Sequence, residues 1–188
     1  MYIDQISVFV ENKTGRLAGI MEVLNKAGID IRAMTIADTA DFGILRMIVD
    51  DTDKALEALK ADGCTAAVTK VIAFTIPDVS GALYNVMGKI NACGINVEYM
   101  YSVMGKVAGR ADIVIRVEDV EKASKVLIDN GVTLIEKKDL CKSAISRIFY
   151  ARVRIVRGGF FVYSRQLCLA LRQKLLYKFY ISAIDKSI

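Results

Sequence analysis

Residues 11–17 read Glu-Asn-Lys-Thr-Gly-Arg-Leu, and residues 26–31 read Lys-Ala-Gly-Ile-Asp-Ile. The pattern returns as Ile-Pro-Asp-Val-Ser-Gly-Ala-Leu at 76–83 and as Ala-Cys-Gly-Ile-Asn-Val at 92–97. At an offset of 66 residues (81 − 15), Gly15, Leu17, Gly28 and Ile29 reappear as Gly81, Leu83, Gly94 and Ile95. A repeat of fixed period identifies the unit that folds. We therefore interpret the chain as two copies of one small module.

Length and composition agree with a packed pair of modules. The chain has 188 residues, of which 54% are hydrophobic and 25% charged. This composition is that of an ordinary folded protein rather than a disordered one. Because small modules are marginally stable alone, we expect the two copies to bury surface against each other.

The charge is distributed unevenly along the chain. Residues 141–188 carry ten Lys or Arg and one acid, a net charge of +9, and the whole chain carries +5. The repeat region is therefore mildly acidic, at −4, and lacks the basic surface that nucleic-acid binding requires. We predict no nucleic-acid partner, and we treat 141–188 as a separate basic tail.

The cysteines do not form a metal motif. Cys64, Cys93, Cys141 and Cys168 lie tens of residues apart, and the chain has no histidine. We expect reduced thiols in a cytoplasmic protein, with no metal and no cofactor. The N-terminus lacks the features of a signal peptide, and no run of 18 apolar residues predicts a membrane span.

Hydrophobic periodicity predicts the same order of elements in both copies. In the first copy, we expect strands over 3–10, 29–37, 43–49 and 66–73, and helices over 17–27 and 54–61. In the second copy, we expect strands over 71–76, 95–104, 111–117 and 132–137, and helices over 82–92 and 119–130. Gly28, Gly63, Gly94 and Gly131 follow the predicted helices, where a left-handed residue is wanted.

The order strand, helix, strand, strand, helix, strand is that of the ferredoxin-like α+β unit. Each unit has four antiparallel strands with both helices on one face. We predict a first module over 1–70, a second over 71–140 and the basic tail over 141–188. The bare sheet face has to be covered, most simply by the other module or by a second chain.

The repeated loop joins a strand to the start of a helix. Free backbone N–H groups and the helix dipole make such a turn a site for a carboxylate or phosphate. Gly15 and Gly81 allow a ligand to approach the main chain. Possible acceptors for an ammonium group nearby are Asn12, Asp78, Asp30 and Asn96. Together these groups suit an α-amino acid; the alternative is that Asn12 and Asp78 only cap their helices.

The element order and both loops resemble the ACT domain, an amino-acid-sensing regulatory module. The resemblance rests on Asn12 to Leu17 with Ala27 to Ile31, and on Asp78 to Leu83 with Gly94 to Val97. Residues 1 to about 140, including Phe42 to Arg46 and Val97 to Tyr101, resemble the tandem ACT proteins of prokaryotes.

The resemblance implies a small ligand, usually an amino acid, held between two ACT units, in a homodimer that regulates a metabolic partner. In the serine-sensing ACT domain of phosphoglycerate dehydrogenase, two Asn side chains from opposite sides of the interface hold the effector. The corresponding ligand-binding residues here are Asn12, Lys13, Thr14, Gly15, Arg16, Leu17, Asp30 and Ile31 in the first copy, and Asp78, Val79, Ser80, Gly81, Ala82, Leu83, Asn96 and Val97 in the second. Thr14 and Ser80 depart from the family, since many ACT domains carry proline there.

The exchange of Asn and Asp between the copies predicts two unequal sites. If each loop faces the second strand of the other module, one site combines Asn12 with Asn96 and the other combines Asp78 with Asp30. The first site would be neutral. The second would hold two carboxylates, which suits an ammonium group.

The sequence contains no catalytic motif, so we predict a protein that is not an enzyme. It lacks histidine, a G-x-S-x-G turn and a P-loop. An alternative function rests on the tail, where Leu167, Leu171, Leu175 and Phe179 alternate with basic residues. This amphipathic pattern suits an anionic membrane surface or a partner protein. The competing interpretations are a solvated extension, or a stretch translated out of frame or beyond the natural stop.

Overall fold

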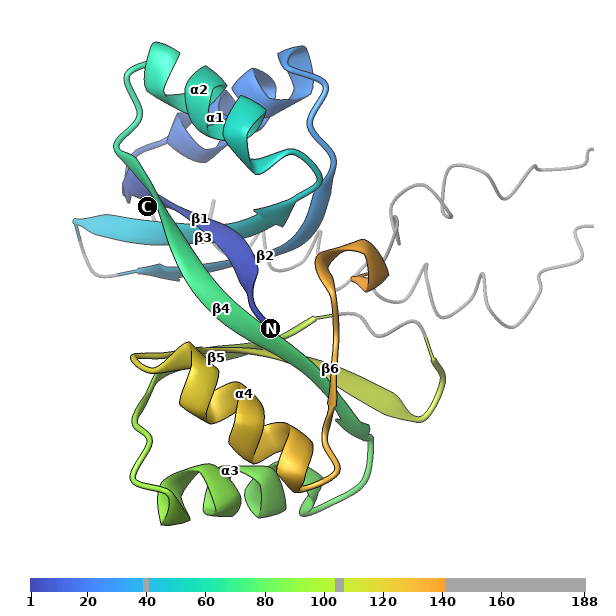
Figure 1. Cartoon of the computed structure of the whole chain (residues 1–188). Helices are drawn as coiled ribbons and strands as arrows, with labels where there is room; N and C mark the ends of the chain where they lie inside the picture. Colours follow the sequence, from blue (N-terminus) through green and yellow to red (C-terminus); the bar gives the residue numbers. More distant parts are fainter. Residues whose placement is uncertain (39–40, 104–106, 141–188) are drawn as a thin grey trace, which may run out of the picture. The chain divides into compact units, whose positions relative to one another are not determined.

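The computed structural model describes residues 1–38, 41–103 and 107–140 (Figure 1). These residues lie within one compact unit, Met1–Ala144. The predictions made for the basic tail, including membrane or partner docking, fall outside the described residues.

Two copies of a strand-helix-strand-strand-helix-strand unit follow each other along the chain, which confirms the predicted α+β fold. The elements of the first copy are β1 (Ile3–Glu11), α1 (Arg16–Lys26), β2 (Ile31–Asp38), β3 (Phe42–Val49), α2 (Thr52–Ala61) and β4 (Ala66–Pro77). Those that follow are α3 (Ala82–Ala92), β5 (Val97–Val103), β6 (Arg110–Val117), α4 (Val120–Asp129), β7 (Thr133–Leu134) and a 3-10 turn, η1 (Lys137–Asp139).

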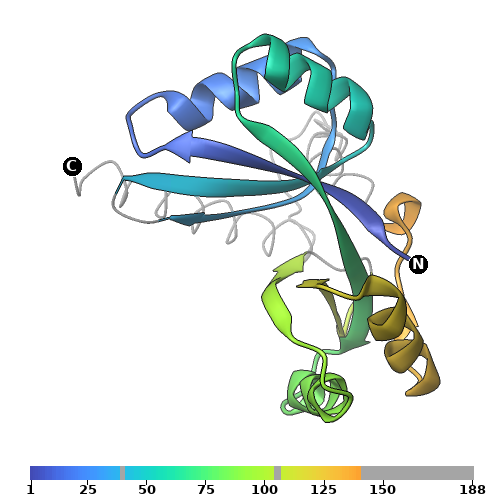
Figure 2. The ribbon, with the colours of Figure 1, turned by 60° about the vertical axis from the view of Figure 1, so that its left-hand side comes forward.

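One long strand, β4, serves both sheets. Its first half pairs with β1 from Ala66 to Val71, and its second half pairs with β6 from Ile72 to Pro77, both antiparallel. The strand order is β2-β3-β1-β4-β6-β5, with β7 also paired to β4. Figures 1 and 2 show β4 passing from the upper sheet into the lower one. The two strands predicted over 66–73 and 71–76 are therefore one continuous strand, and that part of the prediction was wrong.

Each sheet buries one face under its own pair of helices. We call β1, α1, β2, β3, α2 and the first half of β4 the first module, and the rest the second module. The first core contains Ile6, Val8, Val10, Ile20, Leu24, Leu45, Met47, Val49, Ala55 and Leu59. The second contains Ile72, Phe74, Ile76, Val86, Ile90, Ile95, Ile113, Ile115, Val117, Val120, Ala123 and Leu127. Alternate residues of each strand point to these cores, as strand geometry requires.

The sheet faces that carry no helices meet each other through a third apolar cluster. We call it the inter-sheet cluster; it contains Ile3, Ala33, Ile48, Val71, Ala73, Val114, Ile135 and Leu140. Both modules contribute to it, so the expectation that one module helps to cover the other is confirmed.

The last strand is shorter than expected. The strand predicted over 132–137 is wrong beyond Leu134, because β7 covers Thr133–Leu134 alone. The Ile135 N–H still donates to the Ala73 carbonyl at 2.8 Å, and the chain then turns into η1. There Lys137 Nζ donates to Thr52 Oγ1 of α2 at 2.7 Å. The segment leaves the sheet edge because its apolar side chains are buried in the inter-sheet cluster and it binds the first module.

Shared strand β4 yields a stability prediction. Phe74 is fully buried in the second core. We expect Phe74→Ala to lower the free energy of unfolding by about 3–5 kcal/mol, since it removes buried apolar surface and leaves a cavity. Urea unfolding followed by circular dichroism measures the change. The control is Tyr84→Ala on α3, where the side chain is 80% exposed and the change should stay within about 0.5 kcal/mol. Equal effects of the two substitutions would contradict the described burial.

Candidate functional site

The repeated loops lead into helices that have no side-chain cap. We call residues 12–17 the first loop and 78–83 the second loop. The N-cap residues of α1 and α3 are Gly15, with φ 85°, and Gly81, with φ 83°. Both lie in the left-handed region that glycine enters without a steric penalty. The alternative in which Asn12 and Asp78 act as the N-cap residues is therefore wrong.

The other two helices begin differently. Asp51 caps α2 by accepting from the Lys54 N–H at 3.1 Å, and Asp119 caps α4 by accepting from the Lys122 N–H at 2.9 Å. Each module thus has one helix start capped by a carboxylate and one at which the N-cap glycine has no side-chain acceptor. At the second kind, the first helical N–H donates within the loop, from Arg16 to the Lys13 carbonyl and from Ala82 to the Val79 carbonyl, both at 3.2 Å.

The main chain holds both loops in the same way. The Asn12 N–H donates to the Asp41 carbonyl at 3.0 Å, and the Asp78 N–H donates to the Gly109 carbonyl at 2.8 Å. A Cβ atom built on Gly15 or Gly81 would meet no heavy atom within 4 Å. The space over each glycine is therefore open to a ligand.

The side chains make the two loops electrically different. In the first loop, the Glu11 carboxylate lies 3.5 Å from Lys13 Nζ and 3.6 Å from Arg16 Nε. These ion pairs are exposed, and such pairs contribute only about 0–1 kcal/mol, so a ligand carboxylate can compete for the cations. At the offset of 66, Glu11, Lys13 and Arg16 correspond to Pro77, Val79 and Ala82. Glu11 was missed by the sequence analysis, although its replacement by Pro77 in the second copy signalled the difference.

Most apolar residues of the predicted site pack inward, whereas Val79 is 66% exposed. Leu17 and Ile31 lie partly buried against the first core, and Ala82, Leu83 and Val97 lie partly buried against the second. The side chains at 12–14 and 78–80 are exposed. The apolar residues thus fix the loops on the modules, and the polar ones face solvent.

Asp30, at the start of β2, is held by two partners. Its N–H donates to Asp50 Oδ1 at 2.9 Å, and its carboxylate lies 3.4 Å from Arg32 Nη2. Burial acts to raise the pKa of Asp50, but hydrogen bonds from the backbone of Asp30 and Asp51, together with the charge of Arg32, outweigh it and lower that pKa below its usual value. The second site was predicted to hold two carboxylates, those of Asp78 and Asp30. Arg32 adds a cation beside Asp30 that this prediction did not include.

Asn96, at the start of β5, is exposed and has different neighbours. Glu98 takes the place of Arg32 in the second copy, and its Oε1 lies 3.6 Å from Arg116 Nε. The charged group near Asn96 is therefore the Glu98 carboxylate, which is paired with Arg116 of β6. The charged group near Asp30 is the Arg32 guanidinium.

Within a module, the loop and the start of the second strand lie at opposite ends of the sheet. Glu11 pairs with Phe42, at the start of β3, whereas Ile31 pairs with Val49, at its end. A site that uses both parts has to take them from two modules. Among residues 1–38, 41–103 and 107–140, no strand pairing sets the first loop beside Asn96 or the second loop beside Asp30. That combination stays a prediction.

Two hollows differ in size and place. A small one beside the first loop, of about 70 Å³, is lined by Phe9, Val10, Gly15, Arg16, Gly19, Ile20, Asp62 and Cys64. At about 30 Å³ per water, it holds about two waters, so the loop alone does not enclose an amino acid. A larger one, of about 650 Å³, lies away from both loops where β4 passes between the modules.

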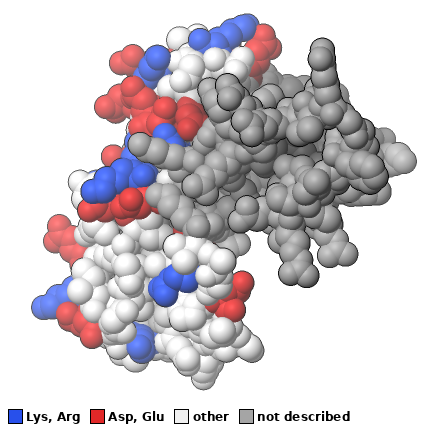
Figure 3. Space-filling view, turned by 90° about the vertical axis from the view of Figure 1, so that its right-hand side faces the viewer, with Lys and Arg blue, Asp and Glu red and all other residues white. Residues whose placement is uncertain are grey.

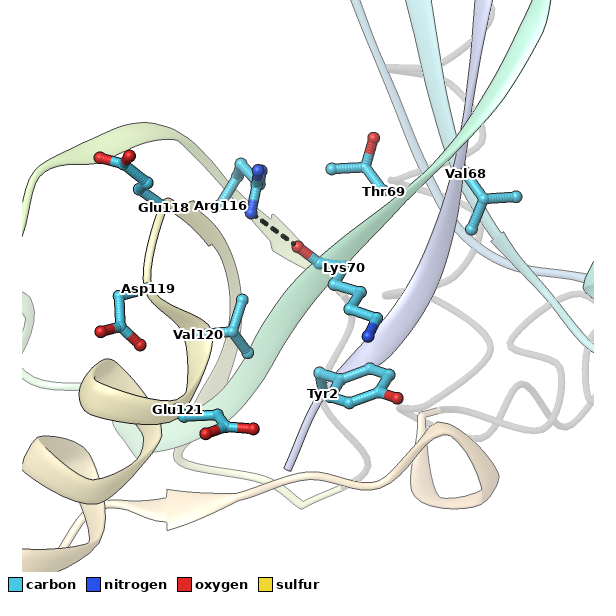
Figure 4. A pocket seen from close by; sticks show the side chains of 9 residues that line it. All are labelled: Tyr2, Val68, Thr69, Lys70, Arg116, Glu118, Asp119, Val120 and Glu121. Carbon is cyan, nitrogen blue, oxygen red and sulfur yellow. Dashed lines mark hydrogen bonds between the residues drawn. The ribbon is translucent and has the colours of Figure 1, made fainter.

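The larger hollow has mixed charge. Figure 4 shows Lys70 reaching over the ring of Tyr2, with its Nζ 4.1 Å from the ring centre. Arg116 Nη1 donates to the Lys70 carbonyl at 3.4 Å. The guanidinium of Arg116 is occupied by this bond and by Glu98, so it joins β6 to β4 rather than facing a ligand.

Other kinds of site find little support in the described residues. No group of three or more His, Cys, Asp or Glu side chains there is placed to hold a metal ion. No helix of that part combines the length and apolar character needed to cross a membrane. On the face in Figure 3, basic and acidic side chains are interspersed, in agreement with the charge predicted for the repeat region.

Comparisons with known proteins agree with the duplicated fold. A family model described as "ACT domain pair" matches residues 1–144. The crystal structure of protein BT0572 from Bacteroides thetaiotaomicron is 43% identical, covers 76% of this chain and 98% of that chain, and has a TM-score of 0.71. The regulatory subunit of aspartate kinase from Thermus thermophilus is 18% identical over 67% of this chain and 90% of that chain, with a TM-score of 0.52, which shows a shared fold. No curated protein matches the chain.

The Asp50 carboxylate beside Asp30 gives a pH prediction. Because its pKa is lowered in the folded state, its contribution to stability is present above the ordinary value of about 3.9 and is lost as the pH falls through the folded pKa. We expect wild type to be more stable than Asp50→Ala at pH 7, with the difference shrinking below about pH 3.9. Urea unfolding between pH 3 and pH 7 measures it. Asp50→Asn, which keeps an acceptor but cannot ionise, is the control. A difference independent of pH would contradict the assignment.

Proposed function

The chain belongs to the ACT domain pair family, and on this basis we propose that it is a sensor that binds an amino acid and regulates a metabolic partner without catalysis. The observation that carries the proposal is the pair of helix starts with glycine N-caps. They recur in both modules, whereas α2 and α4 are closed by Asp51 and Asp119.

The ligand carboxylate is received by backbone N–H groups in the first turn of α1 or α3. These groups carry the positive end of the helix dipole. Side-chain oxygens of Asn12 or Asp78, together with Asn96 or Asp30 from another module, accept from the ligand ammonium. This division of donors and acceptors selects an α-amino acid over a simple anion.

A second copy of the chain completes each site. The two halves of a site lie at opposite ends of their own sheet, and the hollow at the first loop is too small for an amino acid. A homodimer that brings a loop against the start of a second strand would supply the missing wall. Ligand binding then stabilises one arrangement of the two copies. A protein that catalyses no reaction can in this way signal to its partner that the ligand is bound.

The two sites differ in how they hold the ligand. Lys13 and Arg16 beside the first loop favour the ligand carboxylate. Asp78 in the second loop favours the ammonium group, and Arg32 offsets part of the charge of Asp30. The sites are therefore unequal in charge, with the first more basic.

A thermal-shift screen of the twenty amino acids tests the function. We expect one or a few of them to raise the melting temperature; saturation at a hundred times Kd stabilises a fold by about 2.7 kcal/mol. The amino acid should be recovered unchanged, as measured by NMR of the solution. The absence of any shift, or consumption of the amino acid, would contradict the proposal.

Calorimetry with the amino acid that gives the largest shift tests the inequality of the sites. We expect Asn12→Ala and Asp78→Ala each to weaken a different binding step, with unequal losses of affinity. Glu57→Ala, on the exposed side of α2, is the control and should bind as wild type. Equal losses of affinity and stoichiometry from the two loop substitutions would rule out unequal sites.

A further inference from the structure

A buried amide links the two sheets. Gln5 lies in β1 on the face turned away from α1 and α2, and its side chain is fully buried. Its Nε2 donates to the hydroxyl of Tyr99 at 2.8 Å, and its Oε1 accepts from the hydroxyl of Tyr101 at 2.9 Å. Both tyrosines belong to β5 of the second module. One side chain of the first module therefore binds two of the second.

A cation strengthens the same contact. Arg46 of β3 lies with its guanidinium 4.1 Å from the centre of the Tyr99 ring. In the strand register, Arg46 is directly opposite Ser7, which accepts a 3.2 Å hydrogen bond from Gln5 Nε2. Tyr99 is thus held at its hydroxyl by an amide and on its ring face by a cation.

The surroundings of this network are largely apolar. The apolar inter-sheet cluster packs around it, with Tyr99 and Tyr101 partly buried against the cluster. Burial, followed by the neighbouring Tyr99, raises the pKa of the Tyr101 hydroxyl far above its usual value, so it keeps its proton and donates. Within the described residues, the buried Nε of Arg46 has no hydrogen-bond partner, whereas the amide of Gln5 is bound to both tyrosines and to Ser7. These three hydrogen bonds favour one arrangement, because any other leaves the buried amide without its partners.

The network exists on one side of the module pair. At the offset of 66 residues, Gln5 corresponds to Val71, and Tyr99 corresponds to Ala33. Val71 and Ala33 both lie in the inter-sheet cluster. At the same offset Arg46 corresponds to Asp112, which is buried, and Tyr101 corresponds to Thr35. The amide and the two tyrosines of the network therefore have no counterpart on the other side of the module pair.

The bound strands lead to parts of the predicted ligand sites. β1 ends just before Asn12, seven residues beyond Gln5, and β5 begins just after Asn96, three residues before Tyr99. At about 3.3 Å per residue, these separations are about 23 Å and about 10 Å along the strands. The network therefore joins the strand that carries the first loop to the strand that follows Asn96.

We infer that Gln5, Arg46, Tyr99 and Tyr101 form an inter-sheet lock that fixes the orientation of the two modules and carries a change at Asn96 to the first loop. The signalling part rests on the proposed function. The orienting part does not. A shift of β5 by one residue along its axis would take both hydroxyls away from Gln5, so the lock has a closed state and an open state rather than a range of states.

The variants separate orientation from packing. Gln5→Met alone leaves two buried hydroxyls without their partner and should lower the urea midpoint. The triple variant Gln5→Met, Tyr99→Phe, Tyr101→Phe replaces the buried amide and both tyrosine hydroxyls by apolar groups of similar size and leaves Ser7 in place, so most of that loss should be recovered. Val71→Ala, at the position that corresponds to Gln5 at the offset of 66 residues, is the control that weakens packing and leaves the lock intact.

The orientation of the two modules is measured as the distance between two spin labels by electron spin resonance. The labels are attached at Glu57→Cys on α2 and Lys125→Cys on α4, in a protein whose four native cysteines are replaced by alanine. We expect one narrow distance distribution in wild type and in Val71→Ala, and a broad one in the triple variant despite its recovered stability. A narrow distribution at the wild-type distance in the triple variant would overturn the lock.

The signalling part is tested by adding the amino acid that gives the largest thermal shift. We expect wild type to move to a second narrow distance, and the triple variant to stay broad although calorimetry shows that it binds. An unchanged distance in saturated wild type would overturn signalling through the lock. Failure of all twenty amino acids to bind would overturn the proposed function instead, while the distances without amino acid still decide the lock.

Discussion

Strand β4 is one continuous strand that pairs with β1 in one sheet and with β6 in the other. Its side chains alternate without a break, so Ile72, Phe74 and Ile76 enter the second core while Val71 and Ala73 face the space between the sheets. An extra residue in this strand would turn every later side chain to the opposite face. The register of β4 therefore decides which face of the second module meets the first, and the contact of Gln5 with β5 depends on it.

Much of the fold was predictable because its signals are local. Apolar spacing gave the four helices, and Gly28 and Gly94 adopt the left-handed conformation expected after α1 and α3, with φ of 68° and 67°. The errors lie where distant residues decide. No turn residue separates the apolar runs around Val71, so two predicted strands are one. Strand β7 ends early because Ile135 and Leu140 are buried between the sheets. No local sequence pattern predicts that contact.

The candidate site was predictable in its backbone and less so in its charges. Glycine at positions 15 and 81 predicted open turns, and both N-caps have the left-handed conformation. Glu11 and Arg32 had no predicted role, since their ion pairs depend on side-chain positions that the sequence pattern does not record. The lock was missed for another reason: Gln5 and Tyr99 are 94 residues apart, and only the folded sheets bring them together.

The central claim is that the uncapped helix starts receive an amino-acid carboxylate. Backbone amide shifts of the 15N-labelled full chain, titrated with each of the twenty amino acids, test this most directly. The account predicts that at least one amino acid moves the amide signals at 15–17 or 81–83, while those at the Asp-capped start of α2, 52–54, stay in place. Signals that move elsewhere in the chain and leave both loops unchanged would contradict it.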